Sequence, residues 1–204
     1  MEPISKEQTP GESPVLPISE RIAFFREFLK HPLQIGSVIP SSRFLEKRVL
    51  KTAELSTAKT VVELGSGTGG TTRAILRAMA PQAKLLSIEI NPHFYGMIRR
   101  IEDDRLIAHL GNACELQDIL STYDLGAADV VISGIPFSTM SQSTGADILS
   151  AISLALSPNG RFVAYQVSDR VASLCQPFLG TGRVALEFLN IPPMRVFLWE
   201  KPGA

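Results

Sequence analysis

The sequence predicts one α/β domain built on a mostly parallel sheet. From Thr60 onward, short apolar strands alternate with helices, which is typical of a parallel sheet covered by helices on both faces. A glycine-rich turn follows the first of these strands, and the link between the last two strands is too short for a crossover helix. With 204 residues, 45% of them hydrophobic, the chain suffices for one substantial core and is short for two.

The residue pattern assigns seven strands and the helices between them. We expect strands at Thr60–Leu64, Lys84–Glu89, Arg105–Leu110, Ala128–Ile132, Arg161–Gln166, Arg183–Leu189 and Met194–Glu200. We expect helices at Gly70–Met79, Pro92–Ile101, Cys114–Leu120, Gln142–Leu156 and Asp169–Phe178. Residues 157–160, Ser-Pro-Asn-Gly, predict a turn that ends the fourth of these helices. Because residues 190–193 cannot hold a crossover, the last two strands should pair antiparallel.

Two segments precede the domain, which we place at residues 57–204. Residues 1–17 carry four prolines among polar residues, which predicts a flexible tail. Residues 18–56 predict two helices, an amphipathic one from Ser19 to about Lys30 and a second from about Ser42 to Ala53. The apolar face of the first includes Ile22, Phe24, Phe25, Phe28 and Leu29, and its other face carries Arg21, Arg26 and Lys30.

Composition excludes several classes of protein. Basic and acidic residues number 20 each, so no global positive field concentrates nucleic acid. Cys114 and Cys175 are far apart and in no metal-ligand spacing, which predicts no disulfide, no metal site and a reduced, cytoplasmic setting. The N-terminus lacks the pattern of a secretory signal, and no apolar stretch approaches the roughly 20 residues that span a bilayer.

A glycine-rich turn, Glu63 to Gly70, joins the first strand to the following helix. Its glycines Gly65, Gly67 and Gly70 match Gly-x-Gly-x-x-Gly, a pattern that lets backbone approach a ligand closely. The bare pattern also marks turns that bind nothing. The turn therefore indicates a ligand only together with its neighbours.

Those neighbours are two carboxylates, Glu63 and Glu89, which end consecutive strands. Glu63 would repel a pyrophosphate but suits the ammonium of a methionine moiety, directly or through water. Glu89 offers two acceptor oxygens to a pair of ribose hydroxyls. At the edge where open α/β sheets bind ligands, this favours an adenosine-sulfonium cofactor over a dinucleotide.

On these residues the chain resembles the class I S-adenosylmethionine-dependent methyltransferases, a Rossmann-like superfamily, from roughly Thr60 to Glu200. The resemblance implies S-adenosylmethionine as cofactor, S-adenosylhomocysteine as product and no metal. It also implies that Asn112 and Ala113 border the adenine, although Asn112 is equally suited to cap a helix. The cofactor-binding residues that we expect are Ser37, Ser41, Glu63, Gly65, Ser66, Gly67, Thr68, Glu89, Ile90, Asn112, Ala113 and Ser133.

The loop after the fourth strand, Ser133 to Phe137, resembles the N/D-P-P-Y/F loop of amino-directed methyltransferases. It keeps Pro136 and Phe137 but has Ser133 or Gly134 where Asn or Asp is usual, which leaves room for an aliphatic amine. Together with segments 24–29, 36–42 and 190–193, it makes the chain similar to bacterial phospholipid N-methyltransferases, relatives of ribosomal RNA adenine dimethylases. This implies N-methylation of phosphatidylethanolamine, successive in many members, toward phosphatidylcholine.

The same resemblance implies contacts with lipid, and a place on the inner face of the cytoplasmic membrane with anionic lipids. Expected substrate-binding residues are Arg43, Ile135, Pro136 and Phe137, and expected membrane-binding residues are Arg21, Phe24, Phe25, Phe28, Leu29 and Lys30. Tyr165 and His93 are candidate catalytic residues that contact the amine or relay its proton, and either suits a structural role as well. We expect no nucleic-acid partner and no obligate protein partner.

Three alternatives stay open. An RNA or DNA adenine N6-methyltransferase is disfavoured by neutral charge and by the altered loop. A membrane-associated protein that binds S-adenosylmethionine without catalysis would keep the same glycine turn. A nicotinamide dehydrogenase is the most distant, because nothing beyond the glycines suggests hydride transfer.

Overall fold

The structure is a computed structural model that describes residues 42–190 and 192–203. The predicted tail at residues 1–17 and the predicted amphipathic helix at residues 18–30 lie outside the described residues, as do Ser37 and Ser41. Among the helices that are described, none has the length and apolar character needed to cross a bilayer.

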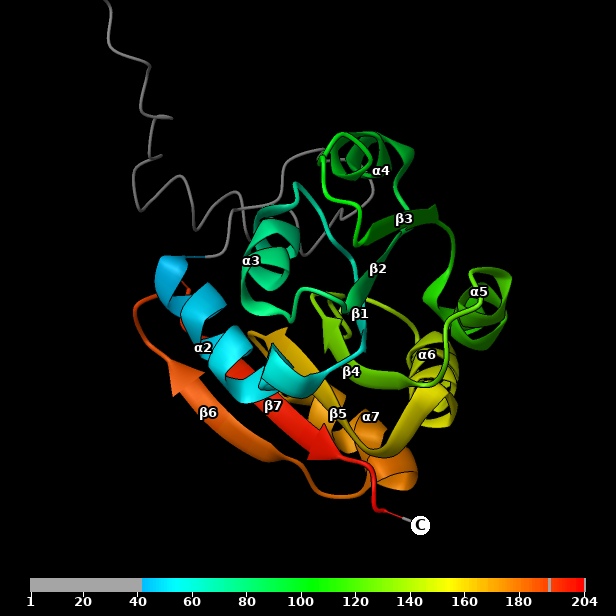
Figure 1. Cartoon of the computed structure of the whole chain (residues 1–204). Coiled ribbons are helices and arrows are strands. Elements are labelled where there is room, and N and C mark those ends of the chain that lie inside the picture. The colour runs from blue at the N-terminus through cyan, green and yellow to red at the C-terminus, as the bar shows by residue number, and fades with distance from the viewer. Residues whose placement is uncertain (1–41, 191, 204) are drawn as a thin grey trace, which may run out of the picture.

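One sheet of seven strands forms the centre of the molecule, in the order β3-β2-β1-β4-β5-β7-β6 (Figure 1). The strands are β1 (Thr60–Leu64), β2 (Lys84–Glu89), β3 (Leu106–Leu110), β4 (Ala128–Ser133), β5 (Leu156–Gln166), β6 (Arg183–Glu187) and β7 (Met194–Glu200). Neighbours from β3 through β5 pair parallel, and β7 lies antiparallel between β5 and β6. The predicted seven-stranded, mostly parallel sheet with an antiparallel last strand is confirmed.

Helices cover both faces of the sheet (Figure 1). They are α2 (Arg43–Ala53), α3 (Gly70–Ala78), α4 (Pro92–Ile98), α5 (Leu116–Thr122), α6 (Gln142–Ala155) and α7 (Arg170–Leu179), with short 3-10 turns η1 (Leu55–Thr57) and η2 (Ala113–Glu115). Ser42, Asn91 and Ser141 begin three of the helices as N-caps, because each side chain accepts a backbone N–H of the first turn. Helices α2 and α3 pack on one face, and α5, α6 and α7 pack on the other.

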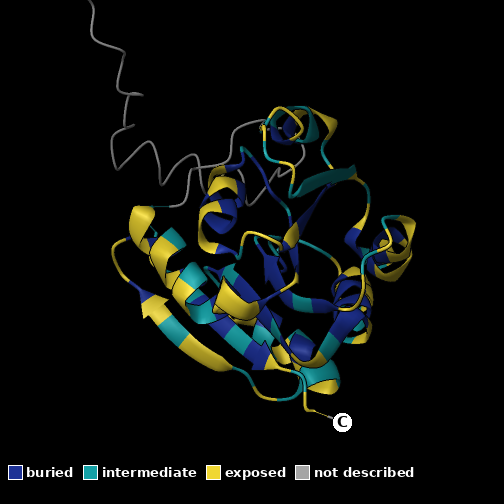
Figure 2. Cartoon of the chain, viewed as in Figure 1, coloured by how far each residue is buried: buried dark blue, intermediate teal, exposed yellow. Residues whose placement is uncertain are grey.

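The sheet divides the core into two layers, because successive residues of a strand point to opposite faces. Val61 and Val130 face α2 and α3, whereas Val62 and Val131 face the helices of the other side. Every residue of β1 is buried, which is expected of a central strand in a doubly covered parallel sheet (Figure 2).

The structure corrects several predicted boundaries. Residues 157–160 are part of β5, where they bulge against β4, rather than a separate turn. Asn159 adopts a left-handed φ of 61°, and the backbones of Asn159 and Gly160 pair with Lys201 beyond β7. Pairing to a distant strand end therefore overrides the local turn signal. Strand β6 ends at Glu187 instead of residue 189, and α4 ends at Ile98 instead of residue 101.

Candidate active site

The carboxyl ends of β1, β2 and β4 meet at one edge of the sheet, by which we mean the side where the parallel strands end and not an outer strand. There the N–H of Gly65 donates to the carbonyl of Ile88 at 2.9 Å, and the N–H of Gly134 donates to the carbonyl of Leu64 at 3.0 Å. Gly65 has a φ of 78°, and a Cβ on it would lie 3.2 Å from Cγ1 of Ile135. The turn after β1 thus touches the loop after β4, at a place where a side chain would be strained.

The glycine turn leads directly into α3. Gly69, with a φ of 83°, is the N-cap residue of this helix, and Gly70 is its first residue. Of Gly69 and Gly70, only Gly69 has the left-handed conformation, although the Gly-x-Gly-x-x-Gly pattern includes Gly70 instead. The turn leaves backbone N–H groups at the first turn of a helix, an arrangement suited to polar ligands.

Glu63 is buried below this turn, with 1% of its surface exposed. Its Oε2 accepts hydrogen bonds from Thr72 Oγ1 at 2.6 Å and from Ser87 Oγ at 2.8 Å. Among the described residues, its Oε1 has no partner, and neither does the buried Oγ of Ser66 in the turn above. Burial raises the pKa of Glu63 to about 7, although both hydroxyls lower it and the charge of Glu89 raises it further.

Glu89 ties the ends of two loops together. Its Oε2 accepts the N–H of Gly67 at 3.0 Å, and its Oε1 accepts the N–H of Asn91 at 2.9 Å. Each carboxylate oxygen has a second acceptor position, so the pair of ribose bonds expected of Glu89 is compatible with this arrangement. The next residue, Ile90, is 63% exposed, an apolar side chain in water beside the carboxylate.

Asn112 and Ala113 follow β3 at the same edge of the sheet. Oδ1 of Asn112 accepts the N–H of Cys114 at 3.1 Å and caps η2. Asn112 thus has the capping role that the sequence allows beside adenine recognition. Asn112 itself is exposed, and Ala113 is buried.

The loop after β4 is held by a residue that sequence analysis missed. Gln166, buried at the end of β5, donates from Nε2 to the carbonyl of Ile135 at 2.6 Å and accepts the N–H of Phe137 on Oε1 at 3.3 Å. Ser133 accepts the N–H of Ile135 on its Oγ at 3.2 Å. The only sequence signal was a polar residue ending an apolar strand.

Phe137, which we expect to contact the substrate, is a core residue in the structure. Its ring is fully buried in the core on the α6 side of the sheet, and a Cβ on Gly145 of α6 would lie 3.7 Å from Cδ1 of Phe137. The aromatic residue therefore anchors the loop to the core. Ile135 and Pro136 are half-buried in the same loop, and Arg43 is exposed at the start of α2.

Tyr165 reaches the loop after β4 from β5. Its hydroxyl lies 3.5 Å from Thr71 Oγ1, and a Cβ on Gly134 would collide with it. Burial raises the pKa of Tyr165 to about 12, so the phenol keeps its proton at neutral pH. His93 lies on the exposed start of α4, where its ring packs edge-on against Phe94. The two candidate catalytic residues thus have different surroundings.

Glu46 of α2 is a second residue that sequence analysis missed. Its Oε1 lies 3.4 Å from the position of a Cβ on Gly70, and burial raises the pKa of its carboxyl. Its charge also raises the pKa of Tyr165. Nothing local to α2 shows that its acidic residue faces α3, because that depends on how the helix packs.

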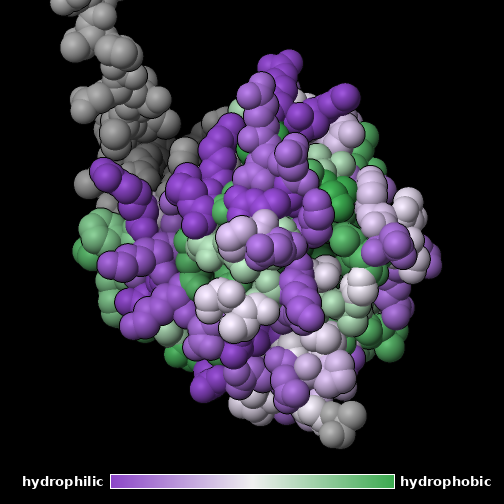
Figure 3. Space-filling view, in the orientation of Figure 1, coloured by the Kyte–Doolittle hydropathy of each residue, from purple (hydrophilic) through white to green (hydrophobic). Residues whose placement is uncertain are grey.

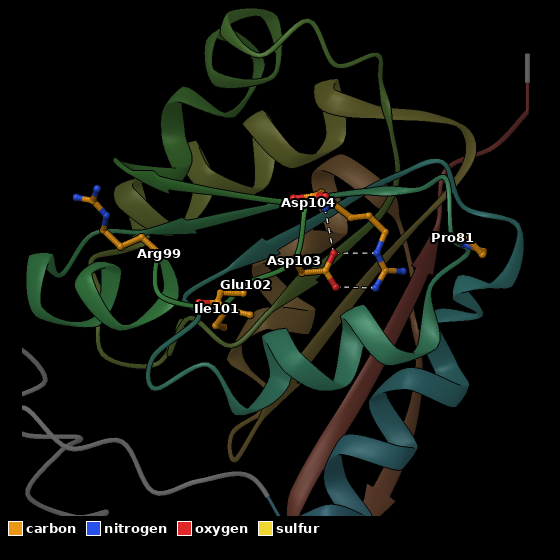
Figure 4. Close-up of a pocket in the computed structure, with 7 residues that line it drawn as sticks. Pro81, Arg99, Ile101, Glu102, Asp103 and Asp104 are labelled. Carbon is orange, nitrogen blue, oxygen red and sulfur yellow. Dashed lines mark hydrogen bonds and ion pairs between the residues drawn. The ribbon is translucent and has the colours of Figure 1, made fainter.

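An open depression at the opposite edge of the sheet has a different character (Figure 4). Its lining includes Asp103 and Arg105, which bond to each other through Arg105 Nε at 2.9 Å and Nη2 at 2.8 Å. These bonds lower the pKa of Asp103 to about 2. Asp103 and Arg105 therefore already neutralise each other. Within the described part of the chain, no group of three His, Cys, Asp or Glu residues is placed to hold a metal ion.

Comparison with known proteins gives one similar sequence and many similar folds. No protein-family profile matches the chain. The ornithine lipid N-methyltransferase of Singulisphaera acidiphila is 30% identical over 141 residues, which are 68% of this chain and 73% of that enzyme.

Two solved structures illustrate the likeness of fold. An O-methyltransferase from Bacillus cereus, in complex with S-adenosylhomocysteine, has a TM-score of 0.64 at 12% identity and covers 90% of this chain and 91% of its own. TomG, an O-methyltransferase from Streptomyces achromogenes in complex with S-adenosylmethionine, has a TM-score of 0.61 at 19% identity, with 92% and 89% covered. The chain has the class I S-adenosylmethionine-dependent methyltransferase fold.

Proposed function

The chain belongs to the family of the ornithine lipid N-methyltransferase of Singulisphaera acidiphila, and on that premise we propose that it methylates the amine of a membrane lipid. S-adenosylmethionine is the methyl donor. The resemblance found in the sequence names phosphatidylethanolamine as substrate, whereas the relative is named for ornithine lipid. Both lipids present an aliphatic primary amine. We propose phosphatidylethanolamine as the substrate, at the inner face of the cytoplasmic membrane, and keep ornithine lipid as the alternative to be tested.

The observation that carries the proposal is a pair of buried oxygens at the glycine turn, Glu63 Oε1 and Ser66 Oγ, which have no hydrogen-bond partner within residues 42–190 and 192–203. A buried acceptor without a donor is costly, so these atoms fit a ligand that brings hydrogen-bond donors. Glu63 would hold the ammonium of the methionine moiety, and Glu89 the ribose hydroxyls. S-adenosylmethionine, when bound, supplies an electrophilic methyl group.

The loop after β4 supports an aliphatic amine over a planar nucleobase amine. Gly134 has no side chain to orient an amine, and the carbonyl of Ile135 already accepts from Gln166. The ring of Phe137 is buried and does not offer a face for stacking. What remains beside the loop is the hydroxyl of Tyr165, which keeps its proton and so is not a base, but whose oxygen can accept an N–H of the amine and orient it. Its ring also offers a face to a cationic product.

Positioning is the main task that these residues perform. An unprotonated amine needs alignment and exclusion of water more than a strong base. Gln166 fixes the loop that lines the reaction site, and Tyr165 closes the space next to Gly134.

The proposal is tested by methyl transfer from radiolabelled S-adenosylmethionine. The full chain is given phosphatidylethanolamine or ornithine lipid in anionic vesicles, and unmodified ribosomal RNA in parallel. We expect labelled mono-, di- or trimethylated phosphatidylethanolamine. The comparison variant is Glu89→Ala. Its cofactor affinity should fall about tenfold or more, because the charge-assisted hydrogen bonds to the ribose hydroxyls are lost.

Each other outcome changes the assignment. Label only in ornithine lipid would move the substrate to that of the relative. Label only in RNA would make the chain an adenine methyltransferase, and cofactor binding without label in any acceptor would make it a binding protein without catalysis.

A further inference from the structure

The turn between β6 and β7 presents two large apolar side chains to water. Phe188 and Leu189 are 68% and 62% exposed, although the residues on either side, Glu187 and Asn190, are buried. Exposing a large apolar side chain to water is unfavourable, and a cluster of such side chains on the surface indicates an interaction site.

This turn is fixed to the rest of the domain. Glu187 pairs with Nε of Arg48 at 2.7 Å and accepts the N–H of Leu189 at 3.0 Å. Asn190 accepts the N–H of Ser42 on Oδ1 at 3.0 Å and donates from Nδ2 to the carbonyl of Pro192 at 2.9 Å. Buried polar side chains thus hold the exposed apolar ones in place.

Helix α2 adds a third apolar side chain and a basic rim. Phe44 is 54% exposed and lies one helical turn before Arg48, on the side of α2 that faces the end of β6. Arg43 and Lys47 are exposed on the neighbouring stripe, whereas the acid Glu46 approaches Gly70 at the start of α3. Figure 3 shows hydrophobic residues at the end of β6 next to hydrophilic residues of α2.

The surface formed by Phe44, Phe188 and Leu189, here called the apolar tip, lies at the edge of the sheet that carries the site. Strand β6 runs parallel to β5, because both pair antiparallel with β7. Its carboxyl end therefore points in the same direction as the ends of β1, β2 and β4. The segment that carries the predicted membrane helix also joins the domain here, at Ser42.

We propose that the apolar tip inserts into the interface of an anionic lipid bilayer, with Arg43 and Lys47 on the headgroups. The inference rests on the proposed function, which places the substrate in such a bilayer. Apolar side chains gain by transfer to the acyl boundary, and bases beside them gain from anionic lipid. Contact at this edge turns the carboxyl ends of the strands toward the lipid, so a headgroup amine meets the site without the lipid leaving the membrane.

The test compares vesicle binding by the full chain and by the variant Phe188→Ser/Leu189→Ser. Vesicles contain phosphatidylethanolamine and phosphatidylglycerol, and bound protein is measured by co-sedimentation. We expect the variant to bind at least tenfold more weakly, with unchanged affinity for S-adenosylhomocysteine by calorimetry. The matched control is Leu154→Ser, which removes an aliphatic side chain that is 61% exposed near the end of α6, at the opposite edge. Vesicle binding by the double variant equal to that of the wild type overturns the inference.

A fluorescent variant distinguishes a bilayer from other occupants. The natural chain has one tryptophan, Trp199, which is 1% exposed and serves as a buried reference. In Phe188→Trp, lipids brominated on the acyl chain should quench the added fluorophore. Two other results would refute bilayer insertion. Fluorescence that changes with protein concentration but not with brominated vesicles would show that a second copy covers the apolar tip. Fluorescence that changes on removal of residues 1–30 but not with brominated vesicles would show that the chain itself covers it.

The two proposals fail in different ways. Wild-type protein that binds vesicles through the apolar tip but methylates no lipid contradicts the proposed function alone. Protein that methylates detergent-solubilised lipid, while the double variant binds vesicles normally, contradicts insertion alone.

Discussion

Two carboxylates at opposite edges of the sheet, Glu63 and Asp103, differ in burial and in the partners of their oxygens. Glu63 is almost fully buried, has one oxygen without a partner among the described residues, and has a pKa raised to about 7. Asp103 has a side chain that is 22% exposed, has both oxygens bonded to Arg105, and has a pKa lowered to about 2.

The difference lies in what each group lacks. Asp103 gains little from a cationic ligand, because it is already paired with the guanidinium of Arg105 and water screens that pair. Glu63 has lost its water without gaining a cation, so it stays largely protonated below neutral pH unless a positive ligand arrives. The size of a depression is therefore a poorer guide to the site than unsatisfied buried oxygens are.

The largest expected effect concerns pH and cofactor affinity. If the ammonium pairs with ionised Glu63, affinity for S-adenosylhomocysteine should rise about tenfold per pH unit as the pH approaches 7 and then level off. In Glu63→Gln this dependence should disappear, and affinity at pH 8 should fall about tenfold. Titration calorimetry between about pH 5.5 and 8.5 measures both. A pH dependence that survives in Glu63→Gln would assign it to another group.

Stability of the ligand-free protein gives an independent check on the same residue. The folded pKa of about 7 lies above the ordinary value of 4.5, so the folded state binds more protons between these values. Raising the pH through this window should therefore lower the free energy of unfolding, and Glu63→Gln should remove that decrease. Asp103→Asn is the matched control and should leave it unchanged.

An intermediate effect is expected at Gln166. Gln166→Leu removes two hydrogen bonds to the loop and leaves only the bond from the Phe137 N–H to the Ile135 carbonyl, which should lower the free energy of unfolding by about 1–3 kcal/mol. Because the loop shifts, kcat should fall more than the cofactor affinity changes. Denaturant titration and steady-state rates measure the two effects.

Phe137→Leu separates stability from loop position, because it keeps both bonds of Gln166 and disturbs only core packing. A similar loss of stability with a nearly normal kcat is the expected result for this control. Equal losses of kcat in the two variants would contradict a positioning role for Gln166.

The smallest effect should come from Asp103→Asn. A partly exposed ion pair that water screens contributes about 1 kcal/mol or less, so stability at pH 7 should change little and cofactor affinity not at all. Because the pKa is lowered, the contribution is present above the ordinary value of 3.8 and is lost as the pH falls toward 2. Urea titrations of both proteins at pH 7 and near pH 2 should therefore converge at the acid end. A loss of cofactor affinity would contradict the separation of the two edges.

The parts of the fold that were predictable from sequence depend on local pattern. The strand and glycine turn around Glu63, and the strand that ends at Glu89, lie where periodicity and spacing placed them. The antiparallel pairing of β6 and β7 followed from the short link between them. Boundaries failed where distant pairing decides, as at Asn159, which bonds to Lys201.

The features of the candidate site that sequence analysis did not predict depend on packing between distant segments. Gln166 acts on a loop about thirty residues earlier, at sequence separations of 29 and 31. Phe137 turns into the core and packs beside Gly145 of α6, and no motif shows that choice. Glu46 approaches α3 only through the way α2 packs on the sheet.

The position of β7 has a consequence for the order of folding during synthesis. Strand β6 pairs only with β7 in the described sheet, and β7 spans residues 194–200. Until those residues leave the ribosome, β6 and the outer edge of β5 have no partner, and the ring of Trp199 has not stacked on Phe162. A nascent chain therefore exposes an unpaired edge until β7 has emerged, the interval in which a chaperone or a misplaced strand competes for it.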